Sequence, residues 1–262
     1  MPRPTSPFPL LAAALALAVL QVGCATKPPA SEPDALEEYY QTNDPLEPTN
    51  RVFYAINNGL DTVLLRPLAV AYRNVVPEVV RTHTHNLLTN LSEPVALFDD
   101  MLQARPRRAG DSFMRLLVNT TIGIGGVFDV ATGWGWPAHD TDGGMTFALW
   151  GLPNGPYLFL PVLGPSSPRD ASGFAGDIAM DPLTWIGQGA AVSALGYSRY
   201  SLNAIDARAR VLDDLDKIKQ TALDPYATIR SLYQQHRQSQ IDTARSAESA
   251  TVPAWFAQTR RP

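Results

Sequence analysis

The chain has 262 residues, of which 45% are hydrophobic, and its 21 Lys and Arg against 25 Asp and Glu give a formal net charge of −4. This mildly acidic balance argues against nucleic acid as a partner, because nucleic-acid binding requires clustered Lys and Arg. The length suits one folded domain with a single core.

The N-terminal segment has the pattern of a bacterial lipoprotein signal. Arg3 precedes an apolar run at 9–20, which is followed by a small residue and then by Cys24, the one cysteine of the chain. The run is shorter than the roughly 20 apolar residues that span a bilayer and fits a signal-peptide core. We predict cleavage after residues 1–23 and lipidation of Cys24. An ordinary secretory signal is the alternative, and Gln21 favours it, since a lipobox usually has Leu there.

Composition divides the remainder into three parts. Residues 24–42 are rich in Pro, Ala and Glu, which predicts a flexible tether between the lipid and the folded body. Residues 43–242 form the predicted domain. Residues 243–262 are rich in Ser, Ala and Thr, which predicts a disordered tail. Cleavage removes only Arg3 among the charged residues, so the mature chain keeps 20 bases against 25 acids, a net charge of −5.

The first predicted helix covers residues 51–71. Apolar residues recur at three-four spacing on one face, the pattern of an amphipathic helix, and polar residues occupy the other face. Pro67 is predicted to interrupt this helix. The apolar face holds Phe53, Ile56, Leu60, Val63 and Leu64, and the polar face holds Asn57, Asn58 and Asp61.

Prolines and acids mark the later helix starts. Pro77 and Pro94 each precede an apolar-periodic run and suit the first helical turn. Asp111 is a plausible N-cap for the next helix. Asp224, which is followed by proline, is predicted to open the last one. A charged helix is predicted over residues 203–219, with inward-facing Ile205, Ala209, Leu212 and Leu215.

The middle of the chain, residues 123–170, is dense in Gly, Pro and aromatic residues. Its β-like pieces at 146–150 and 157–160 are flanked by proline, which argues against central strands. We predict ordered loops and short turns here, with no sheet. The predicted fold class is therefore mainly α.

Two stretches, residues 112–127 and 182–198, are almost free of charge. Sixteen helical residues extend about 24 Å, less than a hydrocarbon core of about 30 Å. These stretches suit either buried core helices or helices within one leaflet, and composition alone favours the core.

Enzyme signatures are missing from the sequence. It has no Gly-x-Ser-x-Gly elbow, and the glycines at 123–126 lack a dinucleotide fingerprint and a phosphate-loop lysine. His139, Asp140 and Asp142 form a small polar cluster that suits a cation or, more commonly, a solvated turn. We predict no catalytic residue, no metal and no cofactor.

Several motifs together resemble the MlaA (VacJ) family of outer-membrane lipoproteins. The resemblance covers residues 43–240, and its most specific parts are the opening motif and the Gly-Pro-Ser-Ser-x-Arg-Asp string. In order, the motifs are Asn43-Asp44-Pro45-Leu46-Glu47-Pro48-Thr49-Asn50-Arg51, Arg66-Pro67, Asn90-Leu91-x-Glu93-Pro94, Asn119-Thr120-x-x-Gly123-x-Gly125-Gly126-x-x-Asp129, Gly155-Pro156-Tyr157-Leu158, Leu160-Pro161-x-Leu163-Gly164-Pro165-Ser166-Ser167-x-Arg169-Asp170, and Asp224-Pro225-Tyr226 with Arg230.

The resemblance implies a ring-like bundle of amphipathic helices that lies in one leaflet of the outer membrane around a central channel. It implies a lipid-anchored, periplasm-facing protein that removes mislocalised phospholipid from the outer leaflet, passes it to a periplasmic phospholipid shuttle protein and associates with a trimeric outer-membrane porin. Helices too short to span a membrane fit such a position.

The resemblance also suggests residues for the channel. Asn57, Asn58 and Asp61 line it or form a solvated face, and Gly123, Gly125 and Gly126 either lie beside it or, as we favour, end a helix. Asp44, Glu47 and Arg51 are expected to make local capping and pairing contacts, and Asp129 is expected to cap a turn. Four tryptophans suit the headgroup zone or packing within the loops: Trp134, Trp136, Trp150 and Trp185.

Two other functions stay open from the sequence. A structural envelope lipoprotein that associates with porins and moves no lipid would have the same anchor and the same motifs. An envelope hydrolase acting on lipid is disfavoured, because no nucleophile set can be placed.

Overall fold

The structure is a computed structural model that describes residues 25, 27–185 and 190–246. Cys24, the predicted signal peptide and most of the predicted tail lie outside these residues. The described chain is mainly helical, as predicted. Over the described ranges, each helix is too short or too polar to cross a membrane.

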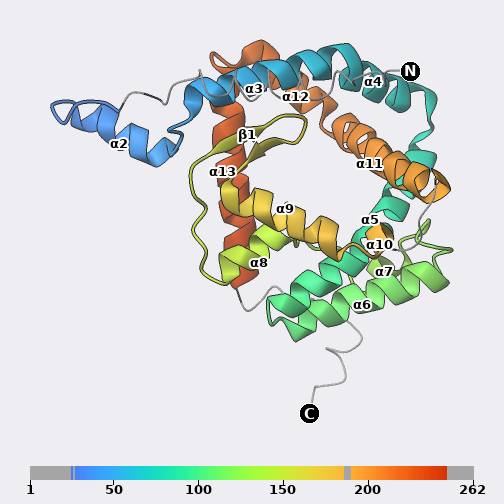
Figure 1. Ribbon diagram of the computed structural model, residues 1–262. Helices are drawn as coiled ribbons and strands as arrows, with labels where there is room; N and C mark the ends of the chain where they lie inside the picture. The colour runs from blue at the N-terminus through green and yellow to red at the C-terminus, as the bar shows by residue number, and fades with distance from the viewer. Residues whose placement is uncertain (1–24, 26, 186–189, 247–262) are drawn as a thin grey trace, which may run out of the picture.

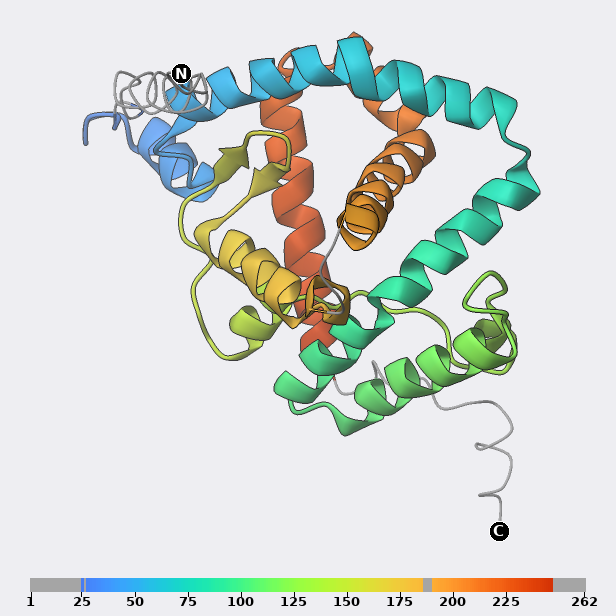
Figure 2. The same cartoon turned by 45° about the vertical axis from the view of Figure 1, so that its right-hand side comes forward.

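Three long helical segments outline a triangle (Figure 2). The first runs through α3 (Glu47–Leu60), η1 (Asp61–Leu65) and α4 (Arg66–Val75), and the chain then turns into α5 (Glu78–Leu102). The third side is α13 (Pro225–Arg245). In Figure 1 these segments, together with the helix that follows α5, surround a central region, so the helices form a ring.

The remaining elements pack against this frame. Helix α6 (Pro106–Thr121) lies along α5 and is followed by the short α7 (Val130–Gly133). Helix α8 (Gly143–Leu149) packs on α9 (Pro168–Met180) and on α13. After α10 (Pro182–Trp185), α11 (Ala190–Arg210) returns to contact α4 and α5, and α12 (Leu212–Thr221) leads into α13.

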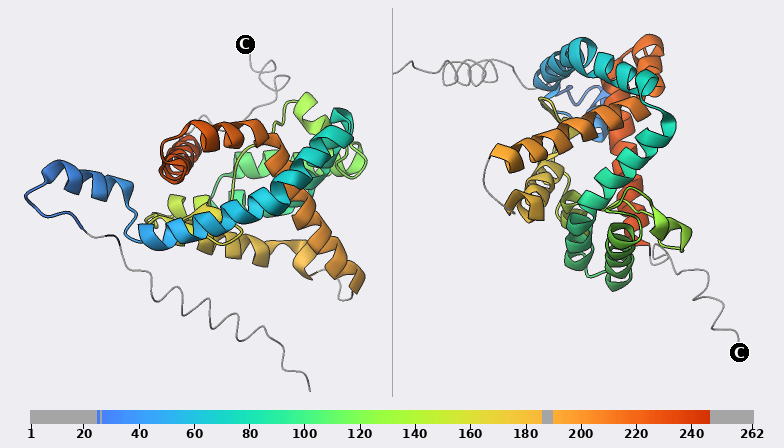
Figure 3. Two further views of the ribbon diagram at one scale, coloured as in Figure 1. Left: turned by 90° about the horizontal axis from the view of Figure 1, so that it is seen from above. Right: turned by 90° about the vertical axis from the view of Figure 1, so that its right-hand side faces the viewer.

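Helix α2 (Pro33–Thr42) lies within the segment predicted as a tether and projects away from the ring (Figure 3). Its C-terminal end is held by Gln234, whose Nε2 donates to the Thr42 carbonyl oxygen at 2.9 Å. At the other end of the chain, α13 continues to Arg245, so the first residues of the predicted tail are helical.

Side-chain caps start four of the helices, and one of these caps is Asp129 at α7. Asp142, Ser167 and Asp224 each accept a hydrogen bond from a backbone N–H in the first turn of α8, α9 and α13. Proline occupies the first turn of α9 and α13, where its missing N–H has no partner to lose. The prediction for Asp224 is thereby confirmed.

Three predictions about helix boundaries were wrong. Pro67 does not interrupt its helix, because the π-turn η1 precedes it: the Arg66 N–H donates to the Asp61 carbonyl, and the wider turn lets the helix continue. Pro94 lies inside α5 and not at a helix start. Asp111 is no N-cap, since α6 begins five residues earlier at Pro106, whose fixed φ suits a first turn.

Two further expectations need correction. Residues 157–160 do contribute a strand: β1 (Leu158–Leu160) pairs antiparallel with β2 (Gly164–Ser166). The flanking prolines allow this because both members of a two-stranded sheet are edge strands. The helix predicted over 203–219 is two helices, α11 and α12, which meet at Val211.

The apolar core is divided into small clusters, and the most aromatic one joins Tyr157 and Phe159 of the hairpin to Tyr226 of α13. Among the described residues, buried polar side chains are at least as numerous as buried apolar ones. Five of them are arginines: Arg108, Arg115, Arg169, Arg208 and Arg230. The ring is therefore held together largely by polar contacts, which must be paired to be tolerated in an interior.

Candidate functional site: the polar interior of the ring

The outer face of the first long segment is apolar. Large side chains are exposed along it, and Val63 reaches 80% exposure. The others are Val52, Ile56, Leu60, Leu64 and Leu68. Phe53, predicted on the same face, instead packs against the aromatic cluster of the hairpin. Exposed apolar surface of this extent marks contact with a membrane or with a partner.

A second exposed apolar surface belongs to α6 and the loop after it, the first of the two charge-poor stretches. Phe113, Leu117, Ile122, Ile124 and Phe128 are all exposed there. Composition favoured a buried core helix for this stretch, yet these five side chains are exposed. We call this surface and the outer face of α3–α4 the apolar exterior. The second charge-poor stretch, 182–198, falls partly outside the described residues.

The inner face of α3 is polar and holds the hairpin. Asn50 accepts from the Phe159 N–H at 2.9 Å and donates to the Tyr157 carbonyl at 3.0 Å. Asn57 accepts from the Val162 N–H at 2.8 Å and donates to the Leu160 carbonyl at 2.9 Å. Two amide side chains, seven residues apart on one helix face, thus bond to the hairpin backbone as a neighbouring strand would.

The other two candidates on this face have different surroundings. Asp61 accepts from Arg208 Nε at 2.7 Å and from Lys219 Nζ at 2.7 Å. Burial opposes its ionisation, but the two cations outweigh burial, and the pKa of Asp61 is lowered. Asn58 is half-buried, and its Oδ1 has no donor within the described part of the chain.

The opening motif forms a corner of the ring. Asp44 is buried and accepts from Arg230 Nη1 at 2.7 Å, from Asn50 Nδ2 at 2.7 Å and from the Tyr226 hydroxyl. These contacts cross from the start of the domain to α13, so the expectation of only local pairing was too narrow. The carboxylate needs these donors, because an unpaired buried charge is costly.

Arg51 makes both a local and a distant contact. Its Nε donates to Glu47 at 2.7 Å, one helical turn away, and its Nη2 donates to Asp224 at 2.6 Å. Local pairing of Glu47 with Arg51 agrees with the sequence expectation. The distant contact ties α3 to the N-cap of α13, at the same corner as Asp44.

The three candidate glycines lie where α6 ends. Gly125 and Gly126 have φ values of +70° and +95°, which favour glycine. A Cβ on Gly126 would collide with the Asn90 side chain, and one on Gly123 would collide with backbone at Phe128 and Asn119. The close packing of Gly123 and Gly126 and the positive φ of Gly125 suit the helix-ending role that the sequence favoured.

Asp129 follows these glycines and caps α7, as expected: it accepts from the Thr132 N–H at 3.2 Å. It also accepts from Asn119 Nδ2 at 3.0 Å, so the loop is tied back to α6. Arg115 of α6 crosses to α5, where its Nε donates to the buried Glu93 at 2.6 Å.

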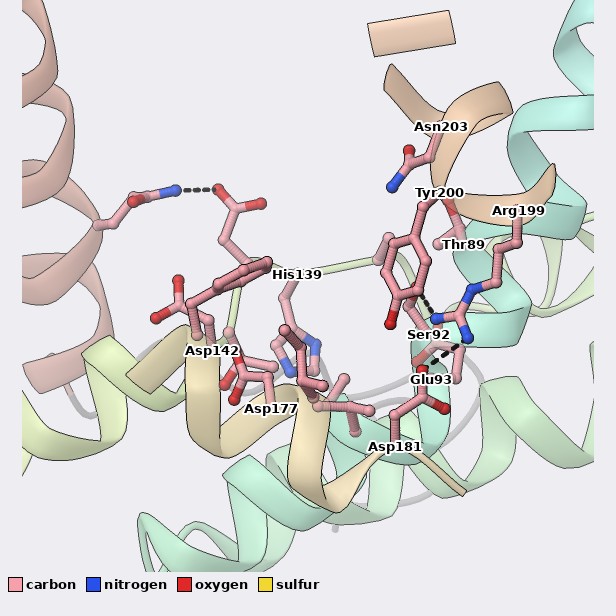
Figure 4. Close-up of a pocket in the computed structure, with 18 residues that line it drawn as sticks. Thr89, Ser92, Glu93, His139, Asp142, Asp177, Asp181, Arg199, Tyr200 and Asn203 are labelled. Atoms are coloured by element: carbon pink, nitrogen blue, oxygen red, sulfur yellow. Dashed lines mark hydrogen bonds and ion pairs between the residues drawn. The ribbon is translucent and has the colours of Figure 1, made fainter. Parts of the chain in front are cut away.

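The polar interior contains two adjoining cavities. The larger has a volume of about 360 Å³ and lies between α5, α9, α11 and the loop before α8 (Figure 4). The smaller, of about 280 Å³, lies between α9, the hairpin and α13. Three residues line both: Asp142, Phe174 and Asp177.

Carboxyl groups gather behind these cavities. Asp99 is fully buried; its Oδ1 accepts from Thr146 at 2.8 Å, and its Oδ2 has no donor among the described residues. Burial and the neighbouring Asp177 raise the pKa of Asp99 to about 7. Burial likewise raises the pKa of Asp177 to about 6, although Asp177 accepts from the Gly143 N–H at 2.9 Å. The two carboxyls therefore compete for a proton near neutral pH.

The polar cluster that the sequence singled out is drawn into this network. His139 Nε2 lies 2.9 Å from Asp100 Oδ2, and Asp142 accepts from Arg237 at 2.6 Å. Asp140 accepts from Gln240 Nε2 at 3.1 Å. The residues that the structure describes contain no group of three or more side chains suited to hold a metal ion.

The tryptophans divide between surface and core. Trp134, Trp150 and Trp185 are exposed, whereas Trp136 packs with Val118 and Ala131. The indole N–H groups of Trp150 and Trp185 donate to backbone carbonyls at 3.0 and 2.7 Å. Of the two alternatives for the tryptophans, interior packing therefore applies to Trp136. The three exposed rings remain available for contact with lipid headgroups.

The sequence motifs and this architecture agree with comparisons to known proteins. The family model for the MlaA lipoprotein matches residues 42–240. The chain belongs to the MlaA lipoprotein family. The resemblance seen in the sequence is thereby confirmed.

Named relatives of this MlaA-family chain match it over most of their length. The intermembrane phospholipid transport system lipoprotein MlaA of Haemophilus influenzae is 30% identical over 241 residues, which cover 90% of this chain and 92% of the relative. Its counterpart in Escherichia coli is 34% identical, and the match covers 73% of this chain and 75% of the relative. An uncharacterized protein of Rickettsia bellii is 35% identical over 76% of each chain.

A solved structure confirms the fold of this family member. It comes from work on the structural basis for maintenance of bacterial outer membrane lipid asymmetry and matches with a TM-score of 0.66 at 32% identity. The match covers 76% of this chain and 98% of that one. The names of the Haemophilus influenzae and Escherichia coli relatives describe a transport lipoprotein, which is not a class of enzyme.

Several MlaA motif residues have contacts that the sequence did not reveal. Asn50, Asp170 and Arg230 appear in the sequence only as motif letters, yet each is a hub of long-range hydrogen bonds. Membership in a family motif is the signal that the sequence offers for these positions, since each has at least one polar neighbour in the chain. The partners could not be named from the sequence, because they lie more than 60 residues away along the chain.

Proposed function

We propose that this protein is an outer-membrane lipoprotein that takes mislocalised phospholipid from the outer leaflet. The lipid would pass through a channel at the centre of the ring to a periplasmic lipid shuttle, which maintains the lipid asymmetry of the outer membrane. Support comes from the names of the Haemophilus influenzae and Escherichia coli relatives, which are intermembrane phospholipid transport system lipoproteins.

The observation that carries the proposal is the placement of apolar and polar side chains. Val63 and its neighbours are exposed, while Asn57 and Asp61 of the same segment contact the hairpin and α11. A helix on the surface of a water-soluble protein would have the opposite arrangement. An apolar exterior suits lipid chains, and a polar interior suits a headgroup, which cannot cross an apolar layer unpaired.

Anchoring and partners complete the proposal. Lipidated Cys24 would hold the ring at the periplasmic side of the outer membrane, and the apolar exterior would rest in the inner leaflet. A trimeric porin would contact part of this exterior. Asn57, Asn58 and Asp61 would support the channel wall, and Gly123, Gly125 and Gly126 would shape the loop beside it.

The test is a chromosomal deletion with surface lipid as the readout. We expect excess phospholipid on the cell surface, measured with a membrane-impermeant amine-reactive probe, together with sensitivity to detergent plus chelator. The wild-type gene should restore both, and the Cys24→Ala gene should not. Normal surface lipid in a clean deletion would refute the proposal and leave a structural lipoprotein that associates with porins.

A further inference from the structure

The two ends of the larger cavity differ in charge (Figure 4). At one end, Arg199 Nη1 donates to Asp181 at 2.7 Å, and its guanidinium lies 5.6 Å from the ring centre of Tyr200. Asn203 of the same helix directs its amide group into the cavity. Glu93 also lines this end and pairs with Arg115 at 2.6 Å, so this end offers hydrogen-bond donors whose charge is already balanced.

The opposite end has an excess of carboxylates. Asp142 pairs with Arg237, whose guanidinium also pairs with Asp170 outside this cavity. Asp140 accepts its hydrogen bond from a neutral amide, and Asp177 accepts from a backbone N–H. Two of the three acids that line this end of the cavity, Asp140 and Asp177, thus accept from neutral donors. The third, Asp142, is paired with Arg237, because Asp170 has a second cation in Arg169 at 2.9 Å.

Asp99 adds an independent sign that a donor is missing here. Its side chain is 0% exposed, and its Oδ2 accepts no hydrogen bond from an N–H or hydroxyl donor among the residues described; the carboxyl group beside it is Asp177. The two carboxyls can hydrogen-bond to each other only when one of them carries a proton. A cationic group at Asp177 would supply the charge that these acids lack.

We propose that this cavity binds the headgroup of a zwitterionic phospholipid with a primary ammonium group, as in phosphatidylethanolamine. The phosphate would lie toward Arg199 and Asn203, and the ammonium would contact Asp177 and Asp140. This inference rests on the proposed function and names the lipid that the ring selects.

The chemistry of the two ends decides among headgroups. A primary ammonium has three N–H donors for carboxylate oxygens, whereas a quaternary ammonium has none. Phosphatidylglycerol has a net negative charge and would be repelled by the acidic end. A volume of about 360 Å³ is at the lower limit for ligand pockets, which suits a headgroup without its acyl chains.

The experiment measures lipid binding by the full acylated protein in mild detergent. Mixed micelles would contain equal amounts of phosphatidylethanolamine, phosphatidylcholine and phosphatidylglycerol, and bound lipid would be identified by mass spectrometry. We expect phosphatidylethanolamine to be enriched about tenfold over phosphatidylglycerol, the size of one charge-assisted hydrogen bond.

Two variants assign the preference to the acidic end. Asp177→Asn keeps an acceptor for the Gly143 N–H and should abolish the enrichment. Asp140→Lys changes an exposed residue, so it should fold, and it should shift the preference toward phosphatidylglycerol. Asp214→Lys makes the same charge change on exposed α12, away from both cavities, and should leave the preference unchanged.

Each outcome has a definite meaning. Binding of all three lipids without preference, or preference for phosphatidylglycerol, overturns the headgroup inference and leaves the proposed function standing. An equal effect of Asp140→Lys and Asp214→Lys also overturns it, because a distant charge would then suffice. If the wild-type protein binds no phospholipid at all, the proposed function itself fails.

Discussion

The buried carboxyl pair of Asp99 and Asp177 should make the folded protein less stable as the pH rises. The pKa of Asp99 is raised from 3.8 to about 7, chiefly by burial and then by Asp177. A raised carboxyl pKa means that the folded state binds the proton more tightly than the unfolded state does. Its contribution is therefore fully present below pH 3.8 and is lost as the pH rises toward 7.

The magnitude follows from the linkage relation. One proton corresponds to about 1.4 kcal/mol for each pH unit between the two pKa values. From pH 5 to pH 8 the folded protein should thus lose about 3 kcal/mol, counting one proton shared by the coupled pair. For a chain of this size that corresponds to a fall in Tm of roughly 6–12 °C.

Asp99→Asn should remove this dependence. An asparagine can accept from Thr146, as Asp99 does, and its amide can donate to Asp177, as a protonated Asp99 would. Thermal unfolding in mild detergent, followed by tryptophan fluorescence at pH 5 and pH 8, compares the variant with wild type and with Asp213→Asn, an exposed carboxyl on α12. Equal pH slopes in Asp99→Asn and wild type would refute the reasoning.

Three further predictions test the corner, the loop and the exterior. Arg230→Met should lower the free energy of unfolding by about 3–5 kcal/mol in denaturant titrations, because Asp44 would stay buried without its cation. Gly126→Ala should destabilise by at least about 1 kcal/mol, while Gly59→Ala, in an open helical position, should stabilise by about 0.5–1 kcal/mol; equal effects would contradict the packing account. Val63→Lys should leave Tm in detergent unchanged and weaken flotation with lipid vesicles, so unchanged flotation would count against a membrane-facing exterior.

Helix starts that depend on an N-cap could be predicted from neighbouring residues in the sequence. Asp224 before a proline, and Asp129 before a short turn, cap their helices because an N-cap needs only a nearby backbone N–H. The same local rules failed for Pro67 and Pro94. A π-turn precedes Pro67, and Pro94 lies inside α5; neither outcome can be deduced from the residues beside the proline.

For the candidate site, the sequence predicted a polar helix face but not the contacts that its residues make. Periodicity identified the polar face with Asn57 and Asp61, yet it could not tell an inner wall from a solvated surface. The reason is that amphipathicity specifies two faces without saying which one meets water. Tertiary contacts supply what periodicity lacks: Asn57 bonds to the hairpin backbone, and Asp61 bonds to Arg208.

Buried ion pairs explain how such a ring can keep its shape. In the proposed placement, with its exterior in lipid, the protein would gain little by burying more apolar groups, because lipid chains are as apolar as a core. Shape must then come from directional contacts such as Asp44 with Arg230 and Glu93 with Arg115. Removal of one partner of such a pair lowers the free energy of unfolding by several kcal/mol, because the other charge remains buried. An open ring can therefore keep a fixed outline with small apolar clusters, and its interior can stay polar enough to receive a headgroup.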